Sequence, residues 1–311
     1  MSEYNFSIEA LNVNKTYQKK NEKIDALIDF NIKIPKGSIY GLLGPNGAGK
    51  STFINILGGL VKKNSGNIKI CNIDIDINAK DSRKKIGIVP QELNIDPFFT
   101  PIELLELQAG LYGVRKKNRR SEEILYNVGL LNQRNAYART LSGGMRRRLL
   151  VAKALVHNPE IIILDEPTAG VDVDLRNNLW NYFKELNKKG TTICLTTHYL
   201  EEAENLCDYI IIINKGKIIK NDTKQNLLNL IGTKTVSFFL DQKYLIPKSL
   251  KKYNAKINSN NNLILNYDKK NTHLKEIIDL LNKEKISFNE INTYESDLED
   301  VFLDLIKNNN S

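Results

Sequence analysis

The sequence lacks any long apolar run. Its longest purely apolar stretches, residues 161–164 and 209–213, have only the length of single strands. A helix that crosses a bilayer needs ~20 mostly apolar residues, so these stretches predict buried strands instead. The N-terminal residues contain an early acidic residue and no continuous apolar segment, which is not the pattern of a secretory signal. We therefore expect a chain that stays in the cytoplasm and does not itself span the membrane.

Cysteine is scarce, with only Cys71, Cys194 and Cys207 in the chain. They are odd in number and show neither CxxC nor Cys/His metal spacing, which argues against a disulfide framework and against a zinc site. We expect all three to be thiols buried in the core.

Acidic residues are outnumbered by basic ones, which gives the chain a formal net charge of +9. Such an excess can indicate an anionic partner, either nucleic acid or the cytoplasmic leaflet of a membrane. The basic residues are spread along the whole chain and form no single long block. We therefore expect no nucleic-acid partner. With 41% hydrophobic and 26% charged residues, the composition is that of an ordinary globular protein.

Apolar and polar positions alternate over about the first forty residues, which predicts antiparallel strands followed by a buried strand at Ile39–Leu43. Short β-branched runs then recur at residues 160–164, 192–196 and 209–214, with helical segments between them. This alternation predicts an α/β fold with a doubly wound parallel sheet. A hairpin is expected at residues 210–219, with its turn at Lys215 and Gly216.

The apolar spacing becomes helical between about residues 100 and 158, which predicts a helical subdomain inserted into the α/β fold. After a break at Gly232 the pattern changes again. Strands are expected at residues 236–240, 263–267 and 286–293, and helices at 274–283 and 297–307. We therefore predict a large domain over residues 6–231 and a small C-terminal α+β domain over residues 232–311.

A glycine-rich run follows the predicted strand Ile39–Leu43 and has the pattern GxxxxGK[ST]. In such a loop the backbone N–H groups and the N-terminus of the next helix bind phosphate oxygens, and glycines permit the close approach. Lys50 is expected to reach the β and γ phosphates, and the Ser51 hydroxyl to bind Mg²⁺. The alternative is a chance match in a turn. The run and the helical residue after it are Gly44, Pro45, Asn46, Gly47, Ala48, Gly49, Lys50, Ser51 and Thr52.

Two carboxylates follow the apolar run at residues 161–164. Ligands bind at the carboxyl ends of the strands in open parallel sheets, where Asp165 and Glu166 are expected. Asp165 can hold Mg²⁺ through water, which leaves Glu166 free to act as a general base toward the attacking water. In the structural alternative, these acids only end the strand or cap the next helix.

A second candidate anion site is the sequence Leu141, Ser142, Gly143, Gly144 and Met145, which is followed by three arginines. The serine hydroxyl and the exposed N–H groups lie at the start of a predicted helix over residues 145–156, where the helix dipole favours an anion. Taken alone, this motif is more simply explained as an ordinary helix cap by Ser142.

Together, these motifs resemble the nucleotide-binding subunit of ATP-binding cassette (ABC) transporters over roughly residues 6–231. They occur in the order of that family: Walker A at residues 44–51, a glutamine loop at 89–91, the signature at 141–145, Walker B at 161–165 with Glu166, a D-loop at 169–172, and a switch histidine, His198. The implied fold is a P-loop NTPase cassette with a parallel-sheet core, an antiparallel β subdomain and a helical subdomain.

The resemblance also implies roles for further residues. Tyr17 would stack on adenine, Gln91 would contact Mg²⁺ and sense a membrane partner, and His198 would contact the γ-phosphate. In this family two cassettes pair head to tail, so that Ser142, Gly143 and Gly144 of one copy close over ATP bound by the other. The expected working unit is therefore a homodimer with ATP and Mg²⁺, and Asp172 would lie at its seam.

Two departures from the commonest family pattern favour export over import. Met145 replaces the usual glutamine, and the D-loop reads Ala-Gly-Val-Asp instead of Ser-Ala-Leu-Asp. Both variants, and the C-terminal segment 297–303, are similar to type 2 drug and polysaccharide exporters, whose permease is a separate six-helix protein. The resemblance implies a subunit that is peripheral on the inner face of the cell membrane. The permease groove is expected at residues 92–101, with Phe98 and Phe99 as contacts or, equally, as local core residues.

Two other functions stay open at this point. A soluble ABC ATPase that acts on ribosomes or another assembly is one, although ribosome-associated members carry two cassettes and chromosome-associated members contain long coiled coils. A regulatory nucleotide-binding module without turnover is the other, although it would be expected to lack Glu166 or His198.

Overall fold

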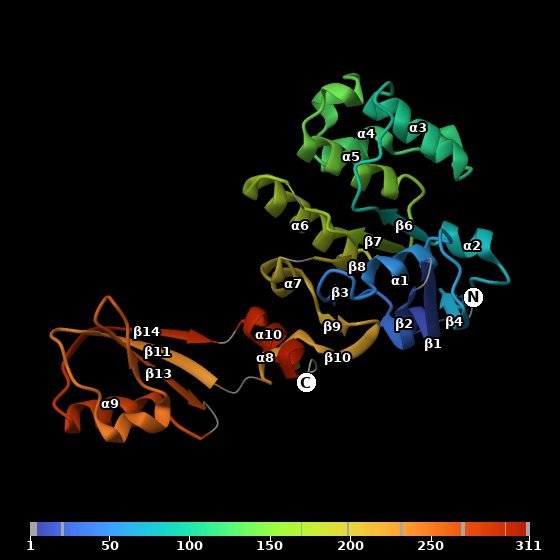
Figure 1. Cartoon of the computed structure of the whole chain (residues 1–311). Coiled ribbons are helices and arrows are strands. Elements are labelled where there is room, and N and C mark those ends of the chain that lie inside the picture. Colours follow the sequence, from blue (N-terminus) through green and yellow to red (C-terminus); the bar gives the residue numbers. More distant parts are fainter. Residues whose placement is uncertain are drawn as a thin grey trace. The chain divides into compact units, whose positions relative to one another are not determined.

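The computed structural model describes residues 5–19, 22–168, 170–197, 199–230, 233–268, 271–295 and 297–308. The chain divides into two compact units, Met1–Lys224 and Gln225–Ser311 (Figure 1). The domain boundary expected from the sequence, between residues 231 and 232, lies outside the described residues and stays a prediction.

The first unit is built on a mostly parallel sheet with the strand order β10-β9-β3-β8-β7-β6 in the described part of the chain. Strands β3, β7 and β8 are buried at every position. Central strands of a parallel sheet are covered on both faces, which is why they are continuous apolar runs. The bounds are β3 Ile39–Leu43, β6 Ile86–Val89, β7 Ile161–Asp165, β8 Thr192–Thr196, β9 Tyr209–Asn214 and the antiparallel β10 Lys217–Thr223.

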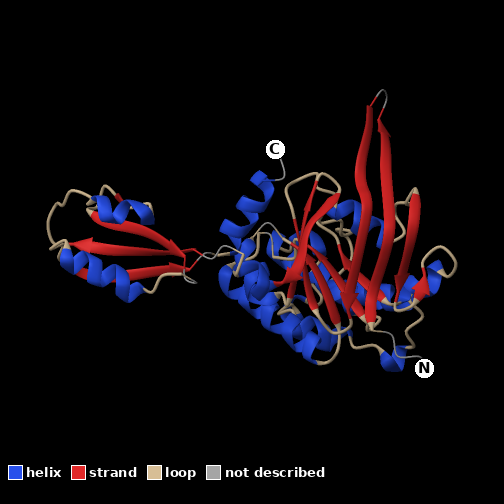
Figure 2. Cartoon of the chain, turned by 90° about the horizontal axis from the view of Figure 1, so that it is seen from below, coloured by secondary structure: helices blue, strands red, loops and turns tan. Residues whose placement is uncertain are grey.

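A second sheet in this unit is antiparallel and has the order β2-β1-β4-β5. Its strands are β1 Phe6–Lys19, β2 Glu22–Pro35, β4 Ser65–Ile70 and β5 Ile73–Asp74. Figure 2 shows the two long strands β1 and β2 side by side, reaching beyond the rest of the sheet. Buried residues of both sheets share one core cluster with α1, Lys50–Leu57, where the rings of Phe30 and Phe53 lie 4.8 Å apart.

Three α-helices occupy the range in which the sequence predicts a helical subdomain: α3 Pro101–Leu111, α4 Ser121–Asn127 and α5 Gly143–Leu155. Figure 1 shows them together at one end of the first unit. Helix α3 begins with a capping box between Thr100 and Glu103 and has a proline in its first turn, which is a strong helix start. Arg148 on α5 donates to the carbonyls of Val128 and Gly129, both at 2.8 Å, and so ties α5 to the end of α4.

The remaining helices of the first unit are α2 Ala79–Lys84, α6 Val173–Lys188 and α7 Leu200–Leu206. In the second unit a sheet of order β12-β13-β11-β14 shares its core with α9, Leu274–Lys283, through Ile277 and Leu281. Its strands are β11 Thr233–Leu240, β12 Lys256–Ile257, β13 Asn262–Asp268 and β14 Phe288–Glu295, and α10 is Leu298–Asn308. Helix α8, Lys224–Leu228, begins at the boundary between the units.

The predicted α/β fold class is confirmed, including the parallel core and the separate antiparallel strands. The prediction for the cysteines is also confirmed, because all three are buried thiols. Burial raises the pKa of Cys194 to about 12, so that its thiol is unreactive at neutral pH. Among the described residues, no helix combines the length and the apolar character that crossing a bilayer requires.

Candidate nucleotide-hydrolysis site

The glycine-rich run forms the connection from β3 to α1, as its sequence predicts. A Cβ on Gly44 would lie 2.3 Å from the carbonyl oxygen of Ile213, and no real side chain tolerates that distance. Gly49 has a φ of 110°, and a Cβ there would lie 2.4 Å from the carbonyl oxygen of Ala26. Glycine is therefore required at both positions for steric reasons, before any ligand is considered.

The loop surrounds a hollow of about 380 Å³. Lys50 lies at its wall, and its Nζ donates to the carbonyls of Gly44 at 2.6 Å and Pro45 at 3.1 Å. Burial lowers the pKa of Lys50, while Asp165 and Glu166 act in the opposite direction. The lining residues are Asn46, Gly47, Ala48, Gly49, Lys50, Ser51, Thr52, Gln91, Asp165 and Glu166.

Asp165 ends β7 and reaches the same hollow as the phosphate loop. Its side chain is 7% exposed, and its Oδ1 accepts a short hydrogen bond from the hydroxyl of Thr196 at the end of β8. Its Oδ2 lies 3.4 Å from the Oγ of Ser51 on α1. The carboxylate is therefore held on one side by the protein and directed on the other side toward Ser51.

Glu166 has an unusual backbone conformation, with a φ of 52°. A non-glycine residue with positive φ is strained, and such residues concentrate at functional sites. Its N–H donates to the Thr196 carbonyl at 3.0 Å, and its Oε2 accepts from the Nε2 of Gln91 at 3.2 Å. The backbone thus turns immediately after β7, and the side chain lies next to the glutamine loop.

Arg147 supports this geometry and was not singled out by the sequence motifs. It lies on α5, is 6% exposed, and donates to the carbonyl of Pro90 at 2.9 Å, directly before Gln91. Burial lowers its pKa, and the charges of Glu166 and Asp165 oppose that shift. The signature helix and the glutamine loop are therefore connected by a buried cation. Three consecutive arginines were the available signal, but sequence alone does not say that Arg147 and Arg148 are buried or which of them reaches Pro90.

The signature residues do not border this hollow. Ser142 caps α5 by accepting from the Met145 N–H at 3.2 Å, so the simple helix-cap interpretation holds for its side chain. Ser142, Gly143 and Gly144 are absent from the lining of the hollow. A Cβ on Gly144 would instead lie 3.4 Å from the Gly170 carbonyl oxygen in the D-loop of the same chain.

Two other predicted site residues lie away from the hollow or outside the described chain. Tyr17 lies on β1, is 36% exposed, and has the Lys15 ammonium 4.9 Å from its ring centre. It does not line the hollow. His198 and Ala169 lie outside the described residues.

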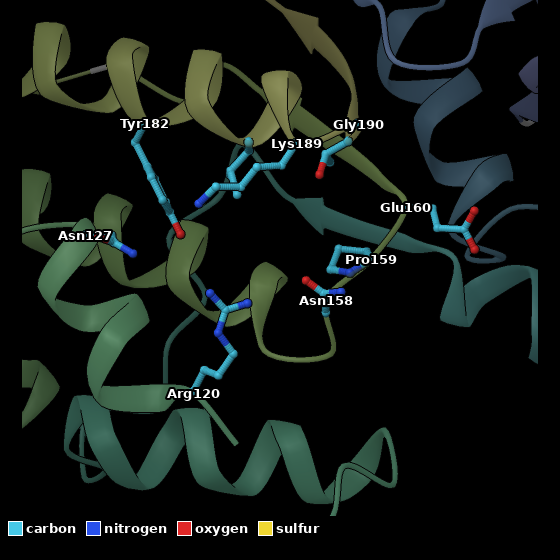
Figure 3. Close-up of a pocket in the computed structure, with 10 residues that line it drawn as sticks. Arg120, Asn127, Asn158, Pro159, Glu160, Tyr182, Lys189 and Gly190 are labelled. Atoms are coloured by element: carbon cyan, nitrogen blue, oxygen red, sulfur yellow. The ribbon is translucent and has the colours of Figure 1, made fainter. Parts of the chain in front are cut away.

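A second hollow, of about 310 Å³, lies between α4, the end of α6 and the loop before β7 (Figure 3). Arg120, Asn127, Tyr182 and Lys189 turn their polar ends toward its centre. The Arg120 guanidinium, however, is paired with Glu123, whose Oε2 accepts from Nε at 2.7 Å. The residues that line this hollow include none of the glycine-rich run at residues 44–51.

The geometry determines what the first hollow can do. A phosphate loop with its lysine, a hydroxyl opposite an aspartate, and a second carboxylate one residue further on are the parts that phosphoryl transfer to water requires. Groups arranged in this way can position a triphosphate and orient an attacking water molecule. These features define a P-loop nucleoside triphosphatase.

Comparison with known proteins gives the family. Residues 27–169 match the family model described as ABC transporter. The linearmycin resistance ATP-binding protein of Bacillus subtilis strain 168 is 42% identical over 231 residues, which is 74% of this chain and 73% of that protein. The Nod factor export ATP-binding protein I of Cupriavidus pinatubonensis is 41% identical over 217 residues, or 69% and 67% of the two chains. The chain belongs to the ABC transporter family, as an ATP-binding and ATP-hydrolysing subunit.

The solved structures agree. A dimeric ATP-binding cassette in a post-hydrolysis state with ADP and phosphate matches with a TM-score of 0.64 and 33% identity, over 70% of this chain and 98% of that one. A nucleotide-free cassette from an ABC transporter matches with a TM-score of 0.61 and 27% identity, over 70% and 91%.

Proposed function

We propose that this chain powers export through a separate six-helix membrane permease, as a homodimer of cassettes bound to the inner face of the cell membrane. The observation that carries this proposal is the 41 to 42% identity, over 69 to 74% of this chain, to proteins named for linearmycin resistance and Nod factor export. The export-type Met145 and the Ala-Gly-Val-Asp D-loop support the same direction. The cargo is not assigned, because in such systems the permease contacts it.

Mg²⁺ fits the donor set of the site. Ser51 Oγ and Asp165 Oδ2 lie 3.4 Å apart, and Gln91 borders the same hollow. Mg²⁺ is typically bound by one or two protein oxygens together with waters and substrate phosphates. Within the described residues there is no group of three or more His, Cys, Asp or Glu that could hold a metal. This suits a cation that arrives with ATP, and when bound it would neutralise charge on the phosphates.

The protein groups would divide the remaining work. Lys50 and the loop N–H groups would hold the phosphates, and Glu166 would accept a proton from the attacking water. Gln91 would keep the Glu166 carboxylate oriented through the 3.2 Å contact described above. For His198 we retain the role implied by the family, a contact with the γ-phosphate.

The second half of the site would come from another copy of the chain. Ser142, Gly143 and Gly144 are accessible at or near the surface, yet none lines the hollow of its own chain. A head-to-tail dimer would bring them over ATP bound by the partner, with Asp172 at the seam. ATP binding would close the dimer, and hydrolysis would reopen it.

We place the permease contact at residues 92–101. A hollow of about 260 Å³ includes Asn94 from this segment, with Gln108, Tyr112 and His157 among its other lining residues. Phe98 is 69% exposed and lies under the Arg139 guanidinium, 5.9 Å from its ring centre. Phe99 is partly buried, so Phe98 is the better candidate for contact with a permease helix.

Phe98→Ala is expected to weaken co-purification with the permease about tenfold, because exposed aromatic anchors contribute much of the energy of an interface. Pull-down from detergent-solubilised membranes measures this directly. Tyr126→Ala is the matched control, since Tyr126 is 70% exposed on α4 and lies outside the segment 92–101. Equal recovery of the permease with Phe98→Ala and wild type would remove Phe98 from the interface.

Tyr17→Ala is expected to weaken ATP binding about tenfold, since stacking of a base on an aromatic ring is worth about 1–3 kcal/mol. Binding of inorganic tripolyphosphate, which has no base, should not change. Titration calorimetry with both ligands separates the two effects. Loss of affinity for tripolyphosphate as well would mean that the variant disturbs the phosphate loop, and unchanged ATP affinity would rule out stacking on Tyr17.

The transport proposal as a whole is tested by purifying the tagged chain from membranes in detergent and identifying what accompanies it. A six-helix membrane protein is the expected partner. Recovery with ribosomes instead would favour the soluble ABC ATPase alternative and overturn the export proposal.

A further inference from the structure

A fully buried carboxylate lies behind the candidate site, and none of the roles proposed above involves it. Glu202 on α7 is 0% exposed and does not line the nucleotide hollow. Acidic side chains are rarely buried so completely unless they are paired with donors. The contacts of this side chain therefore need an explanation.

Two donors converge on the same oxygen of Glu202. Its Oε1 accepts from the Thr168 hydroxyl at 3.0 Å and from the Trp180 indole N–H at 3.0 Å. Thr168 and Trp180 are themselves 1% and 8% exposed. Burial raises the pKa of Glu202, and the hydrogen bonds from Trp180 and Thr168 oppose that shift.

The donors come from the segments that carry the proposed catalytic groups. Thr168 follows Glu166 by two residues and precedes the D-loop. Glu202 itself lies on α7, which begins two residues after His198, and its backbone N–H donates to the Tyr199 carbonyl at 3.0 Å. Trp180 lies on α6, the helix that begins after Asp172.

A second contact joins helix α6 to the residue directly before α7. Arg176, also on α6, lies over the ring of Tyr199 with its guanidinium carbon 5.1 Å from the ring centre. The backbone N–H of Arg176 donates to the carbonyl of Asp172 at 2.8 Å and fixes the first turn of α6 after the D-loop. The segment after Glu166 and helix α6 thus meet at one acidic side chain, which lies on the helix that follows the switch segment.

We propose that Glu202 is a positioning residue for ATP hydrolysis, which ties the segment after Glu166 and helix α6, through Thr168 and Trp180, to the helix that begins directly after the His198 segment. The proposal rests on the roles proposed above for Glu166 and His198. It concerns turnover and not nucleotide affinity, because Glu202 lies away from the phosphate loop.

Two substitutions separate positioning from bulk packing. Glu202→Gln retains an oxygen that can accept from Thr168 and Trp180, and is expected to keep kcat within about threefold of wild type. Glu202→Leu fills the space but leaves both donors buried without their partner, a loss that is costly in a protein interior. We expect it to lower kcat about tenfold while the Kd for ATP stays within about twofold.

The chain supplies its own spectroscopic reporter, because Trp180 is the single tryptophan. Its indole N–H is bonded to Glu202, so Glu202→Leu should shift the fluorescence emission maximum to shorter wavelength. Glu202→Gln should shift it little. A change in emission shows that the bond has been removed, independently of any effect on activity.

Leu206→Ala is the control for lost stability, since Leu206 lies on the same helix, is 5% exposed, and has no part in this set of hydrogen bonds. It should lower Tm but leave kcat at 25 °C within about twofold. If Glu202→Leu does not fold, Thr168→Val tests the same connection: it should lower kcat about threefold or more, without changing Trp180 emission.

Three outcomes would each overturn the proposal. One is a wild-type kcat in Glu202→Leu together with a shifted emission maximum, and another is a wild-type kcat in folded Thr168→Val. The third is a loss of kcat in Leu206→Ala as large as that in Glu202→Leu. A separate experiment tests the proposed role of Glu166 as the general base. If the unaltered full-length chain hydrolyses ATP and Glu166→Gln stops it, that assignment stands whatever the Glu202 variants do.

Discussion

Glu166→Gln is expected to bind ATP as wild type does but to hydrolyse it at least ~100-fold more slowly, since a positioned general base contributes about 10²- to 10⁴-fold. Glutamine has the same size and can keep the contact with Gln91 but cannot accept the proton of the attacking water. The strained backbone at this residue, with its φ of 52°, is unaffected by the change, so the fold should be retained. Phosphate release measures turnover.

The same variant should accumulate as an ATP-bound dimer, because closure would proceed and reopening by hydrolysis would not. Size-exclusion chromatography with and without ATP tests this. Glu160→Gln is the matched control: Glu160 directly precedes β7, is paired with Lys85, and is absent from the lining of the nucleotide hollow. A Glu166→Gln enzyme that turned over at the wild-type rate would exclude Glu166 as the base.

The central strands could be predicted from the sequence because burial on both faces makes them continuous apolar runs. Strands β8 and β9 have the predicted limits, and β7 is shifted by one residue. Helix α1 begins at Lys50, inside the glycine-rich run, because Lys50 and Ser51 belong both to the phosphate loop and to the first helical turn. It ends at Leu57, and Gly59, two residues later, has a left-handed φ of 74°.

Short strands escaped prediction where long-range pairing defines them. Strand β4 begins with Ser-Gly-Asn, a sequence that favours a turn, and it is a strand because it pairs with β1 more than fifty positions earlier. Strand β12, only Lys256–Ile257, lies in the polar stretch of the second unit and exists through its pairing with β13. In β4 the apolar alternation is confined to Ile68 and Ile70, and β12 is too short to show one.

The site shows the same contrast between residues that a local motif identifies and residues that depend on long-range contacts. Residues 44–51 and the pair Asp165 and Glu166 follow a local motif, so sequence alone identifies them. The groups that orient them do not: the Thr196 hydroxyl on Asp165 and the bond from Arg147 to Pro90 join positions 31 and 57 residues apart. Such partners depend on which strands are neighbours in the sheet, and no spacing rule states that in advance.

Lys50→Ala is expected to abolish measurable ATP hydrolysis and to weaken ATP binding by about a hundredfold or more. Removing one partner of a buried, hydrogen-bonded charge pair costs about 2–5 kcal/mol, and each 1.4 kcal/mol is a factor of ten in affinity. Lys50 is the only cationic residue among those that line the described hollow, so no neighbouring lysine or arginine there can replace it. Lys50→Arg should not restore binding, because the planar guanidinium does not fit where a compact ammonium bonds two backbone carbonyls.

Titration of ATP against the folded variants, with Tm recorded for each, distinguishes lost binding from lost structure. Lys50 donates to the carbonyls of Gly44 and Pro45 within its own loop, so its truncation should change Tm by a few degrees at most. Lys80→Ala is the control, because Lys80 is exposed and does not line the hollow. It should change neither the affinity for ATP nor Tm. A Lys50→Ala chain that bound ATP with wild-type affinity would show that the phosphates are held elsewhere. If Glu166→Gln lost as much affinity for ATP as Lys50→Ala, the charges of Lys50 and Glu166 would act together in ATP binding. They would then not act one after the other, in binding and in hydrolysis.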